Sequence, residues 1–280
     1  MRISTKARMN RMFTNGGCLD VAIDHGVCNE PSFLVGLEDM ASVVNTLVDA
    51  RPDAIQMAYG QADLLQNRPE KDKPALVMRI DMGNPYNDQR HRAMWSMLQN
   101  ADEPIIGALE MDAAAVVVNL FMLPDEPELF HQCVENISRV RAACHKYGMP
   151  LMIEPLVMLP NDVRGGYQVD GNAEKIVTLT RLASEMGADI IKADPTENPE
   201  DFHRVVEAAR VPVLVRGGGK EDLKTVLIKS AALMAQGAQG MVYGRNIYQH
   251  DNPKQVVAAL MAMIHNGASG EEAWEIYQSA

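Results

Sequence analysis

Short apolar runs alternate along the chain with longer stretches in which apolar residues recur at helical spacing. The apolar runs are continuous, not alternating apolar and polar, which is typical of strands buried on both faces. We therefore expect eight buried strands, at residues 18–23, 53–58, 75–80, 114–119, 150–155, 188–192, 212–216 and 240–243.

The stretches between these runs have the pattern of amphipathic helices. Residues 128–147 place Leu129, Cys133, Ile137 and Val140 on one face, and Gly148 follows as a stop signal. The same plan predicts helices at residues 173–186, 200–209 and 224–236. A repeated helix–glycine–strand order indicates βα units and a parallel sheet.

About eight βα units favour a closed (β/α)₈ barrel, a TIM barrel, over an open sheet. Such a barrel needs about 250 residues, which is nearly all of this 280-residue chain. We expect a single domain over residues 1–280, in which residues 1–16 form an N-terminal extension, a helix across the lower face of the barrel. Residues 60–73 and 83–91 are expected to be functional loops or short helical insertions.

Composition excludes several classes of function. The chain is 47% hydrophobic and 22% charged, as in ordinary globular proteins, and its formal net charge is −11. Neither a Lys/Arg-rich run nor an apolar stretch of about 18 residues occurs, so we expect no nucleic-acid and no membrane partner. The N-terminus lacks the pattern of a signal peptide, and the four cysteines form no C-x-x-C pair. These features predict reduced thiols in the cytoplasm and no metal site.

Lys192 ends the predicted strand at 188–192. A lysine near a core is costly unless its charge is paired or lost, and a neutral amine can attack a carbonyl to form a Schiff base. The alternative is structural: a lysine that reaches the strand end or forms an ion pair with Asp194.

The other strand ends are also polar. Active sites of (β/α)₈ barrels lie at the C-terminal ends of the strands. There the chain places Asp24, His25, Arg79, Asn119, Glu154, Lys192, Arg216, Gly217, Gly218, Gly219, Gly244 and Arg245. Each position alone has a structural explanation, but together they predict one site at the barrel mouth.

The ends of the last two strands are rich in glycine. Phosphate sites in barrels are frequently built from the loops after strands 7 and 8. Gly217, Gly218 and Gly219 would let backbone amides approach an anion, and Gly244 and Arg245 would supply the second half. Such a local device would hold an anion within an acidic protein.

Asp24, Glu154 and Lys192 supply the groups that Schiff-base chemistry needs. That chemistry uses an amine, a group that shuttles protons to the carbinolamine, and a base at the cleaved hydroxyl. Arg79, Arg216 and Asn119 are candidates for binding the other end of the substrate. His25 is a weaker candidate for substrate contact, because its ring is expected to point away from Asp24.

These motifs together resemble the archaeal-type class I fructose-bisphosphate aldolase family, the DhnA-like and DeoC-like Schiff-base aldolases. The resemblance rests on the segments 24–26, 187–192, 212–219 and 237–248. It implies a (β/α)₈ barrel without a metal or other cofactor, sugar-phosphate substrates, and a homo-oligomer, often a decamer. It also implies that Lys192 is the nucleophile, Asp24 the acid on strand 1, and Gly217, Gly218, Gly244 and Arg245 the phosphate site.

The chain departs from this family on strand 5. Where these fructose-bisphosphate aldolases have Tyr-Pro-Arg-Gly, residues 154–157 read Glu-Pro-Leu-Val. A glutamate here is more similar to tagatose-bisphosphate or sulfofructose-phosphate aldolases. Arg216 stands where a small residue is usual. These departures favour a substrate other than fructose 1,6-bisphosphate.

We therefore expect a metal-independent class I aldolase, a carbon–carbon lyase that acts on a ketose phosphate or a related phosphorylated keto compound. One alternative keeps the lysine and transfers an acyl or ketol group, as in a thiolase or a transaldolase. Another is a catalytically inactive sugar-phosphate-binding barrel.

Overall fold

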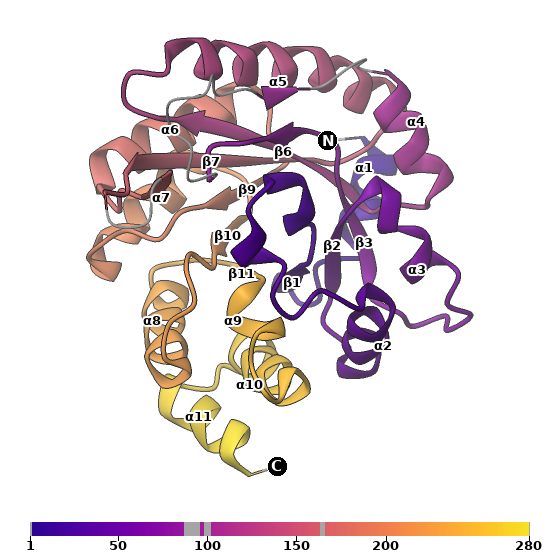
Figure 1. The fold of residues 1–280 in the computed structure, drawn as a ribbon, viewed down its shortest axis with the longest axis vertical. Coiled ribbons are helices and arrows are strands. Elements are labelled where there is room, and N and C mark those ends of the chain that lie inside the picture. Colours follow the sequence, from indigo (N-terminus) through magenta and orange to yellow (C-terminus); the bar gives the residue numbers. More distant parts are fainter. Residues whose placement is uncertain (1, 87–95, 98–101, 163–165, 280) are drawn as a thin grey trace.

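The computed structural model describes residues 2–86, 96–97, 102–162 and 166–279. Within them, eight parallel strands close into a barrel, which helices surround on the outside (Figure 1). The strands follow the order β6–β3–β2–β1–β11–β10–β9–β7, and a further pairing of β6 with β7 closes the ring. The predicted (β/α)₈ fold is confirmed.

All eight predicted strands are present. Their bounds are β1 Cys18–Ala22, β2 Ala54–Ala58, β3 Ala75–Arg79, β6 Ala115–Met122, β7 Leu151–Pro160, β9 Ile190–Ala193, β10 Val213–Arg216 and β11 Gly240–Tyr243. Two of them, β6 and β7, continue beyond the predicted ends and stay paired from Val116–Leu151 to Met122–Val157. Their extension carries the antiparallel strand β8 (Tyr167–Val169) on β7.

The predicted helices are also present, as α5 (Pro127–Tyr147), α6 (Ala173–Glu185), α7 (Phe202–Ala209) and α8 (Leu223–Ala235). The remaining α-helices are α1 Ile3–Met9, α2 Met40–Ala50, α3 Asp63–Gln66, α4 Asp102–Glu110, α9 Arg245–Tyr248, α10 Pro253–Asn266 and α11 Gly270–Gln278. Short 3₁₀ turns are η1 His25–Cys28, η2 Pro31–Phe33, η3 Tyr59–Gln61 and η4 Pro199–Asp201.

The two expected insertions are partly visible. The first contains η3 and α3, which are short helical elements as predicted. The second begins with β4 (Met82–Gly83), which pairs with β5 (Ser96–Met97). Residues 87–91 of the second insertion lie outside the described residues.

Alternate residues of each strand face opposite sides, so the barrel has an inner and an outer packing layer. Residues such as Leu19, Ile55 and Leu76 pack outward against the helices. The inner layer contains small and medium apolar side chains: Cys18, Ala22, Ala54, Ala75, Val77, Ala115, Val117, Met152, Ile190, Leu214 and Val242. Met9 and Met12, from the N-terminal segment, join this inner cluster, and Met12 is fully buried.

The inward positions become polar toward the C-terminal ends of the strands. The same alternation that buries Val77, Val117 and Leu214 brings Arg79, Asn119 and Arg216 to the inside two residues later. The apolar floor and the polar mouth of the barrel are thus parts of one strand pattern. Among the described helices, none is long and apolar enough to cross a membrane.

Candidate active site

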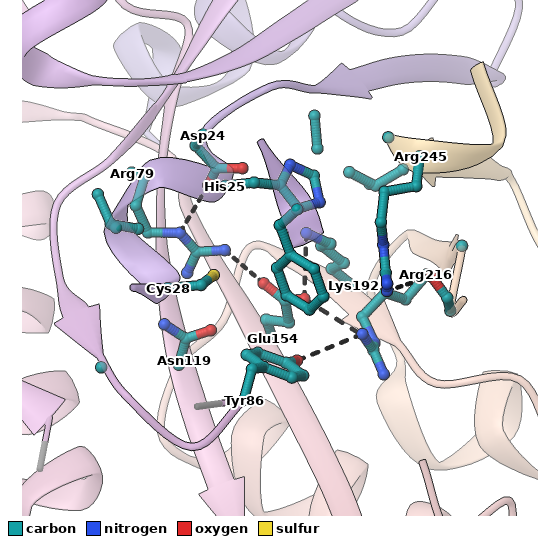
Figure 2. Close-up of a pocket in the computed structure, with 18 of the residues that line it drawn as sticks. Asp24, His25, Cys28, Arg79, Tyr86, Asn119, Glu154, Lys192, Arg216 and Arg245 are labelled. Carbon is teal, nitrogen blue, oxygen red and sulfur yellow. Dashed lines mark hydrogen bonds and ion pairs between the residues drawn. The ribbon is translucent and has the colours of Figure 1, made fainter. Parts of the chain in front are cut away.

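A pocket with about 640 Å³ of empty space opens at the C-terminal ends of the strands (Figure 2). It is lined by Ala22, Asp24, His25, Val27, Cys28, Phe33, Arg79, Gly83, Tyr86, Asn119, Phe121, Glu154, Lys192, Arg216, Gly217, Gly218, Val242, Gly244 and Arg245. Eleven of the twelve site residues proposed from the sequence are in this lining. The exception is Gly219, which is not among the lining residues and whose carbonyl accepts a hydrogen bond from Asn246 Nδ2 at 3.1 Å.

Lys192 is buried on β9, and its amine faces the pocket beside a carboxylate. Its Nζ lies 3.1 Å from Glu154 Oε1 and 3.4 Å from Gln56 Oε1. Asp194 does not serve as its partner, because Asp194 Oδ1 accepts from Arg216 Nε at 2.5 Å and Asp194 Oδ2 accepts from the Val157 amide. The alternative of a structural Lys192–Asp194 pair is therefore wrong.

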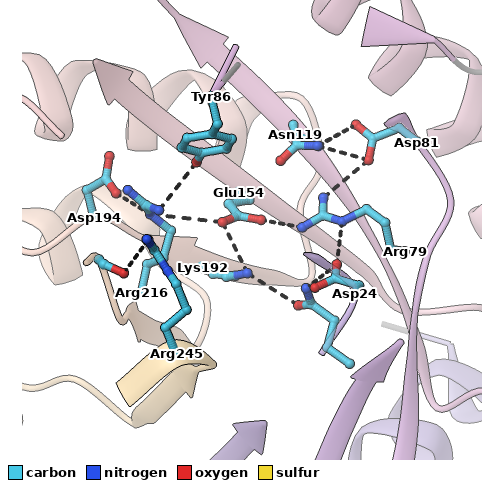
Figure 3. Close-up of polar contacts among 12 residues, drawn as sticks. Asp24, Arg79, Asp81, Tyr86, Asn119, Glu154, Lys192, Asp194, Arg216 and Arg245 are labelled. Carbon is cyan, nitrogen blue, oxygen red and sulfur yellow. Dashed lines mark hydrogen bonds and ion pairs between the residues drawn. The ribbon is translucent and has the colours of Figure 1, made fainter. Parts of the chain in front are cut away.

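Arg79 is the centre of a group of carboxylates. Its Nε donates to Asp24 Oδ2 at 2.9 Å, Nη1 to Asp81 Oδ1 at 3.2 Å, and Nη2 to Glu154 Oε2 at 2.5 Å. All three nitrogens are thus bonded within the protein. Arg79 lines the pocket as expected, but its guanidinium holds three carboxylates in place and leaves none of its nitrogens without a partner for substrate binding (Figure 3).

Asn119 and Asp24 are also held from the inside. The Asn119 amide group donates from Nδ2 to both oxygens of Asp81 at 3.1 Å. Asp24 Oδ2 accepts from Gln56 Nε2 at 2.6 Å as well as from Arg79. Both of these bonds use Oδ2, so within the described residues the other oxygen of Asp24 is left for the pocket.

Both central carboxyl groups are held in the ionised form. Burial alone would raise the pKa of Asp24, but the Arg79 and Lys192 cations outweigh it and lower the pKa to about 2. Burial likewise opposes ionisation of Glu154, yet Lys192, Arg79 and Arg216 lower its pKa below the ordinary value. At neutral pH both groups are bases.

The glycine-rich ends of β10 and β11 lie side by side at the mouth. A Cβ on Gly217 would come within 2.9 Å of the Tyr243 ring, and one on Gly244 within 2.6 Å of the Ala22 carbonyl oxygen. Arg245 Nη2 donates to the Gly218 carbonyl at 2.8 Å, and the Asn246 amide donates to the carbonyls of Gly217 and Gly219. These bonds fix the loop after β10 against the loop after β11.

Arg245 has no carboxylate partner among the described residues. Its guanidinium stacks on the Phe33 ring with its carbon 4.1 Å from the ring centroid, and its Nε is buried without a hydrogen-bond partner there. Burial, followed by repulsion from Arg216, lowers the pKa of Arg245. A partly buried guanidinium at a pocket wall, without an ion pair in the described residues, favours an anionic ligand.

Arg216 lies next to Arg245 but is balanced by Asp194. Its Nη1 donates to the Tyr86 hydroxyl at 3.4 Å, whereas its buried Nη2 has no hydrogen-bond partner in the described part of the chain. Tyr86 follows β4, and burial raises the pKa of its hydroxyl, which therefore stays protonated. Tyr86 is a pocket residue that the sequence did not single out.

His25 lines the pocket between two aromatic rings. Its centroid lies 5.7 Å from that of Phe33 and 5.5 Å from that of Tyr248. Burial lowers the pKa of His25 to about 4, so the ring is neutral at neutral pH. Cys28 also lines the pocket, and burial raises the pKa of its thiol to about 12.

Two polar residues inside the strands were not predicted from the sequence. Gln56 and Asp20 are fully buried at inward positions of β2 and β1. Both Asp20 oxygens lack a hydrogen-bond partner among the described residues, and burial raises the pKa of this carboxyl to about 8. The signal was present in each case, because each is the single polar residue within an otherwise apolar run.

In the described part of the chain, no cluster of three or more His, Cys, Asp or Glu side chains is arranged to hold a metal ion. The chemistry that the pocket offers comes from an amine, two carboxylates and an unpaired guanidinium. Such a set suits attack on a carbonyl of an anionic compound.

Comparison with known proteins gives a family that fits this arrangement. Residues 18–250 match the DeoC/LacD family of aldolases. An uncharacterized aldolase of Saccharolobus solfataricus is 31% identical over 276 residues, which covers 98% of this chain and 99% of the relative. A 3-hydroxy-5-phosphonooxypentane-2,4-dione thiolase of Escherichia coli is 27% identical and covers 98% of this chain and 87% of the relative.

Solved structures confirm the barrel. A Schiff-base-forming fructose-1,6-bisphosphate aldolase superposes with a TM-score of 0.75 at 24% identity, covering 93% of this chain and 100% of the other. A fructose-bisphosphate aldolase of Slackia heliotrinireducens gives 0.78 at 15% identity, covering 99% and 89%. With a family match that includes every barrel strand and the whole pocket, the chain belongs to the DeoC/LacD family of aldolases.

Proposed function

We propose that this protein is a class I aldolase that cleaves or forms a carbon–carbon bond in a ketose phosphate or related phosphorylated keto compound, through a Schiff base on Lys192. The observation that carries the proposal is the position of Lys192 Nζ, 3.1 Å from an ionised glutamate within a pocket that also contains an unpaired arginine. The amine has a base beside it, and the substrate has an anion site nearby.

Glu154 serves the nitrogen. It accepts a proton from the Lys192 ammonium, which frees the amine to attack the carbonyl carbon and form a carbinolamine. Glu154 then returns the proton to the carbinolamine hydroxyl, which leaves as water and gives the iminium ion. The carboxylates around Lys192 stabilise this cation electrostatically.

Asp24 serves the cleaved bond. Its pKa of about 2 keeps it ionised at neutral pH, and one oxygen remains for the pocket. Asp24 accepts the proton of the hydroxyl on the carbon two positions from the iminium carbon. That carbon becomes the carbonyl carbon of the released aldehyde, its bond to the carbon next to the iminium carbon breaks, and the electron pair of that bond forms an enamine. Protonation of the enamine and addition of water then release the ketone and restore Lys192.

The phosphate is held between the ends of β10 and β11. Arg245 supplies a cation without an ion pair in the described residues, and Gly217, Gly218 and Gly244 allow close approach of an anion. Arg216 Nη2, which has no hydrogen-bond partner among the described residues, is a further donor on the same side. Asn119 and His25 line the rest of the pocket and are candidates for contacts to the substrate hydroxyls.

Borohydride trapping with dihydroxyacetone phosphate tests the nucleophile. We expect reduction to leave a stable adduct on Lys192, located by peptide mapping, because an imine is reduced to a secondary amine. Lys192→Met should abolish the adduct and lower kcat by at least about 10³-fold. The matched control is Lys224→Met, which removes an exposed lysine on α8 and should keep the adduct.

Other outcomes assign the protein differently. If the wild-type chain forms no adduct with any phosphorylated ketone, the aldolase mechanism fails and a sugar-phosphate-binding barrel remains. If an adduct forms but no aldehyde is released, while addition of coenzyme A yields an acyl thioester, the lysine serves acyl transfer. Acyl transfer is the alternative reaction because one relative is a thiolase.

We further propose that the chain acts as a homo-oligomer in the cytoplasm without a metal cofactor. The support is the family resemblance of the motifs, and for the metal also the pocket chemistry, in which Lys192 would do the work of a Lewis acid. Activity that survives dialysis against a chelator would agree with the last point.

A further inference from the structure

Five side chains at the pocket floor form a closed ring of polar contacts. Lys192 contacts Glu154, Glu154 contacts Arg79, Arg79 contacts Asp24, Asp24 contacts Gln56, and Gln56 contacts Lys192. The path from Lys192 through Glu154 and Arg79 to Asp24 can be followed in Figure 3. Four members of the ring line the pocket, whereas Gln56 does not.

The chemistry of its neighbours fixes the orientation of the Gln56 amide. Ionised Asp24 can only accept, so the group 2.6 Å from its Oδ2 must be the Nε2 donor. The other end of the amide is then Oε1, which accepts from Lys192. A flipped amide would set an oxygen against a carboxylate and a donor against a donor.

Two acceptors on one amine determine where its lone pair points. A neutral lysine amine has two N–H groups and one lone pair, arranged tetrahedrally about Nζ. Glu154 Oε1 and Gln56 Oε1 can each accept one N–H. After Glu154 has taken the third proton, rotation about the Cε–Nζ bond restores both N–H contacts. The lone pair then occupies the remaining tetrahedral position, which points to neither acceptor and is available to the pocket.

From this geometry we infer that Gln56 is a positioning residue, which directs the lone pair of Lys192 into the pocket and holds Asp24 in place for the cleavage step. The inference rests on the proposed Schiff-base function. Because Gln56 is fully buried and outside the pocket lining, it acts through Lys192 and Asp24 and does not touch substrate.

Two replacements of Gln56 separate positioning from packing. Gln56→Met keeps the length of the side chain but removes both polar contacts. We expect kcat and the rate of borohydride trapping to fall by about 10²-fold, with KM changed by less than about threefold, because a misdirected nucleophile loses the near-attack geometry. Thr180→Val is the matched control, since it removes a fully buried hydroxyl on α6 from a residue that belongs neither to the ring nor to the pocket lining.

Gln56→Glu gives the more specific result. A protonated carboxyl can donate to Asp24 and accept from Lys192, as the amide does, whereas an ionised one places a negative charge against Asp24. Relative to wild type at each pH, kcat of this variant should be close to normal at the acidic end of the range. It should then fall more than tenfold as the pH rises and the new carboxyl ionises.

The outcomes distinguish this inference from the proposed function. Absence of an adduct in the wild-type chain would reject the function itself. An adduct that forms at the wild-type rate in Gln56→Met, or a pH-independent activity ratio for Gln56→Glu, would reject only the positioning role. Circular dichroism shows whether each variant is folded, and failure of both to fold would assign Gln56 to the fold and also overturn the inference.

Discussion

Asp20 lies within β1, two positions before the inward Ala22, and is the buried carboxyl of the barrel interior for which no partner is seen in the described residues. The other carboxyls around it, those of Asp24, Asp81, Glu154 and Asp194, each bond to an arginine. Burial raises the pKa of Asp20 to about 8, so it is mostly protonated at neutral pH.

This pKa makes folding stability depend on pH in a defined direction. The unfolded chain releases the Asp20 proton near pH 3.8, whereas the folded chain keeps it up to about pH 8. The folded state therefore binds more protons in this window, and the free energy of unfolding falls as pH rises from about 4 to 8, by at most about 1.4 kcal/mol per pH unit.

Asp20→Asn should flatten that decline, because an amide stays neutral. In urea unfolding at several pH values, the variant should gain stability relative to wild type as pH rises toward 8. Glu207→Gln, an exposed replacement on α7, should leave the profile unchanged. A variant that runs parallel to wild type from pH 4 to 9 would show that Asp20 does not titrate in this window.

At the level of single residues, the sequence predicted the pocket well where polar residues end a strand. Asp24, Glu154, Lys192 and Arg245 were found because a parallel barrel brings all strand ends to one mouth. Gln56 was missed because a lone polar residue inside an apolar run does not reveal which distant side chains it will bond, here Asp24 and Lys192. Tyr86 reaches the pocket from a connection after β4, whose path no periodicity encodes.

Among the elements, the N-terminal segment has a defined task in the barrel. The sequence predicted an extension that forms a helix across the lower face of the barrel, but it did not show which residue of the extension enters the barrel. In the structure α1 leads to Met12, which is fully buried against the inner layer that contains Cys18, Ala54 and Ala75. These small side chains leave room at the barrel floor, and Met12 fills it.

Met12→Ala should therefore destabilise the whole barrel. Removing a fully buried methionine side chain costs about 2–5 kcal/mol through lost burial and a residual cavity. Ile3→Ala is the matched control in the same segment, because Ile3 is 89% exposed. Chemical denaturation should separate the two variants clearly. Equal stabilities would mean that the segment does not close the floor in solution.

The strands and helices were predictable because their periodicity records burial. What the pattern did not show are the ends of β6 and β7, which run on past the barrel as a paired ribbon that carries β8. The predicted strand at 150–155 ends at Pro155, a residue type that is usually found at the ends or edges of strands. Here β7 continues through Pro155 to Pro160.

On the scale of the whole molecule, charge is distributed unevenly. The formal net charge is −11, yet the pocket contains Arg245 without an ion pair among the described residues. A strongly acidic protein does not accumulate anions over its surface. Stabilisation by an anion would therefore report on a local site.

Inorganic phosphate should stabilise the folded chain. A ligand that binds only the folded state at a concentration of 100 times its Kd adds about 2.7 kcal/mol to the free energy of unfolding. Arg245→Met should remove this gain, whereas Arg139→Met, which changes an exposed arginine on α5, should retain it. Sodium chloride at equal ionic strength is the reference. A gain that is the same with chloride would indicate general screening, and no phosphate site.

The position of Met12 at the barrel floor also determines how small molecules reach the pocket. Because Met12 fills the barrel floor, the interior is open at the mouth and closed at the floor. Arg245 and Tyr86 lie at this mouth. Under the proposed mechanism, substrate therefore enters and products leave through this mouth. In the proposed mechanism the ketone stays covalently bound to Lys192 and leaves after the aldehyde, and a molecule bound in the mouth would block both entry and exit.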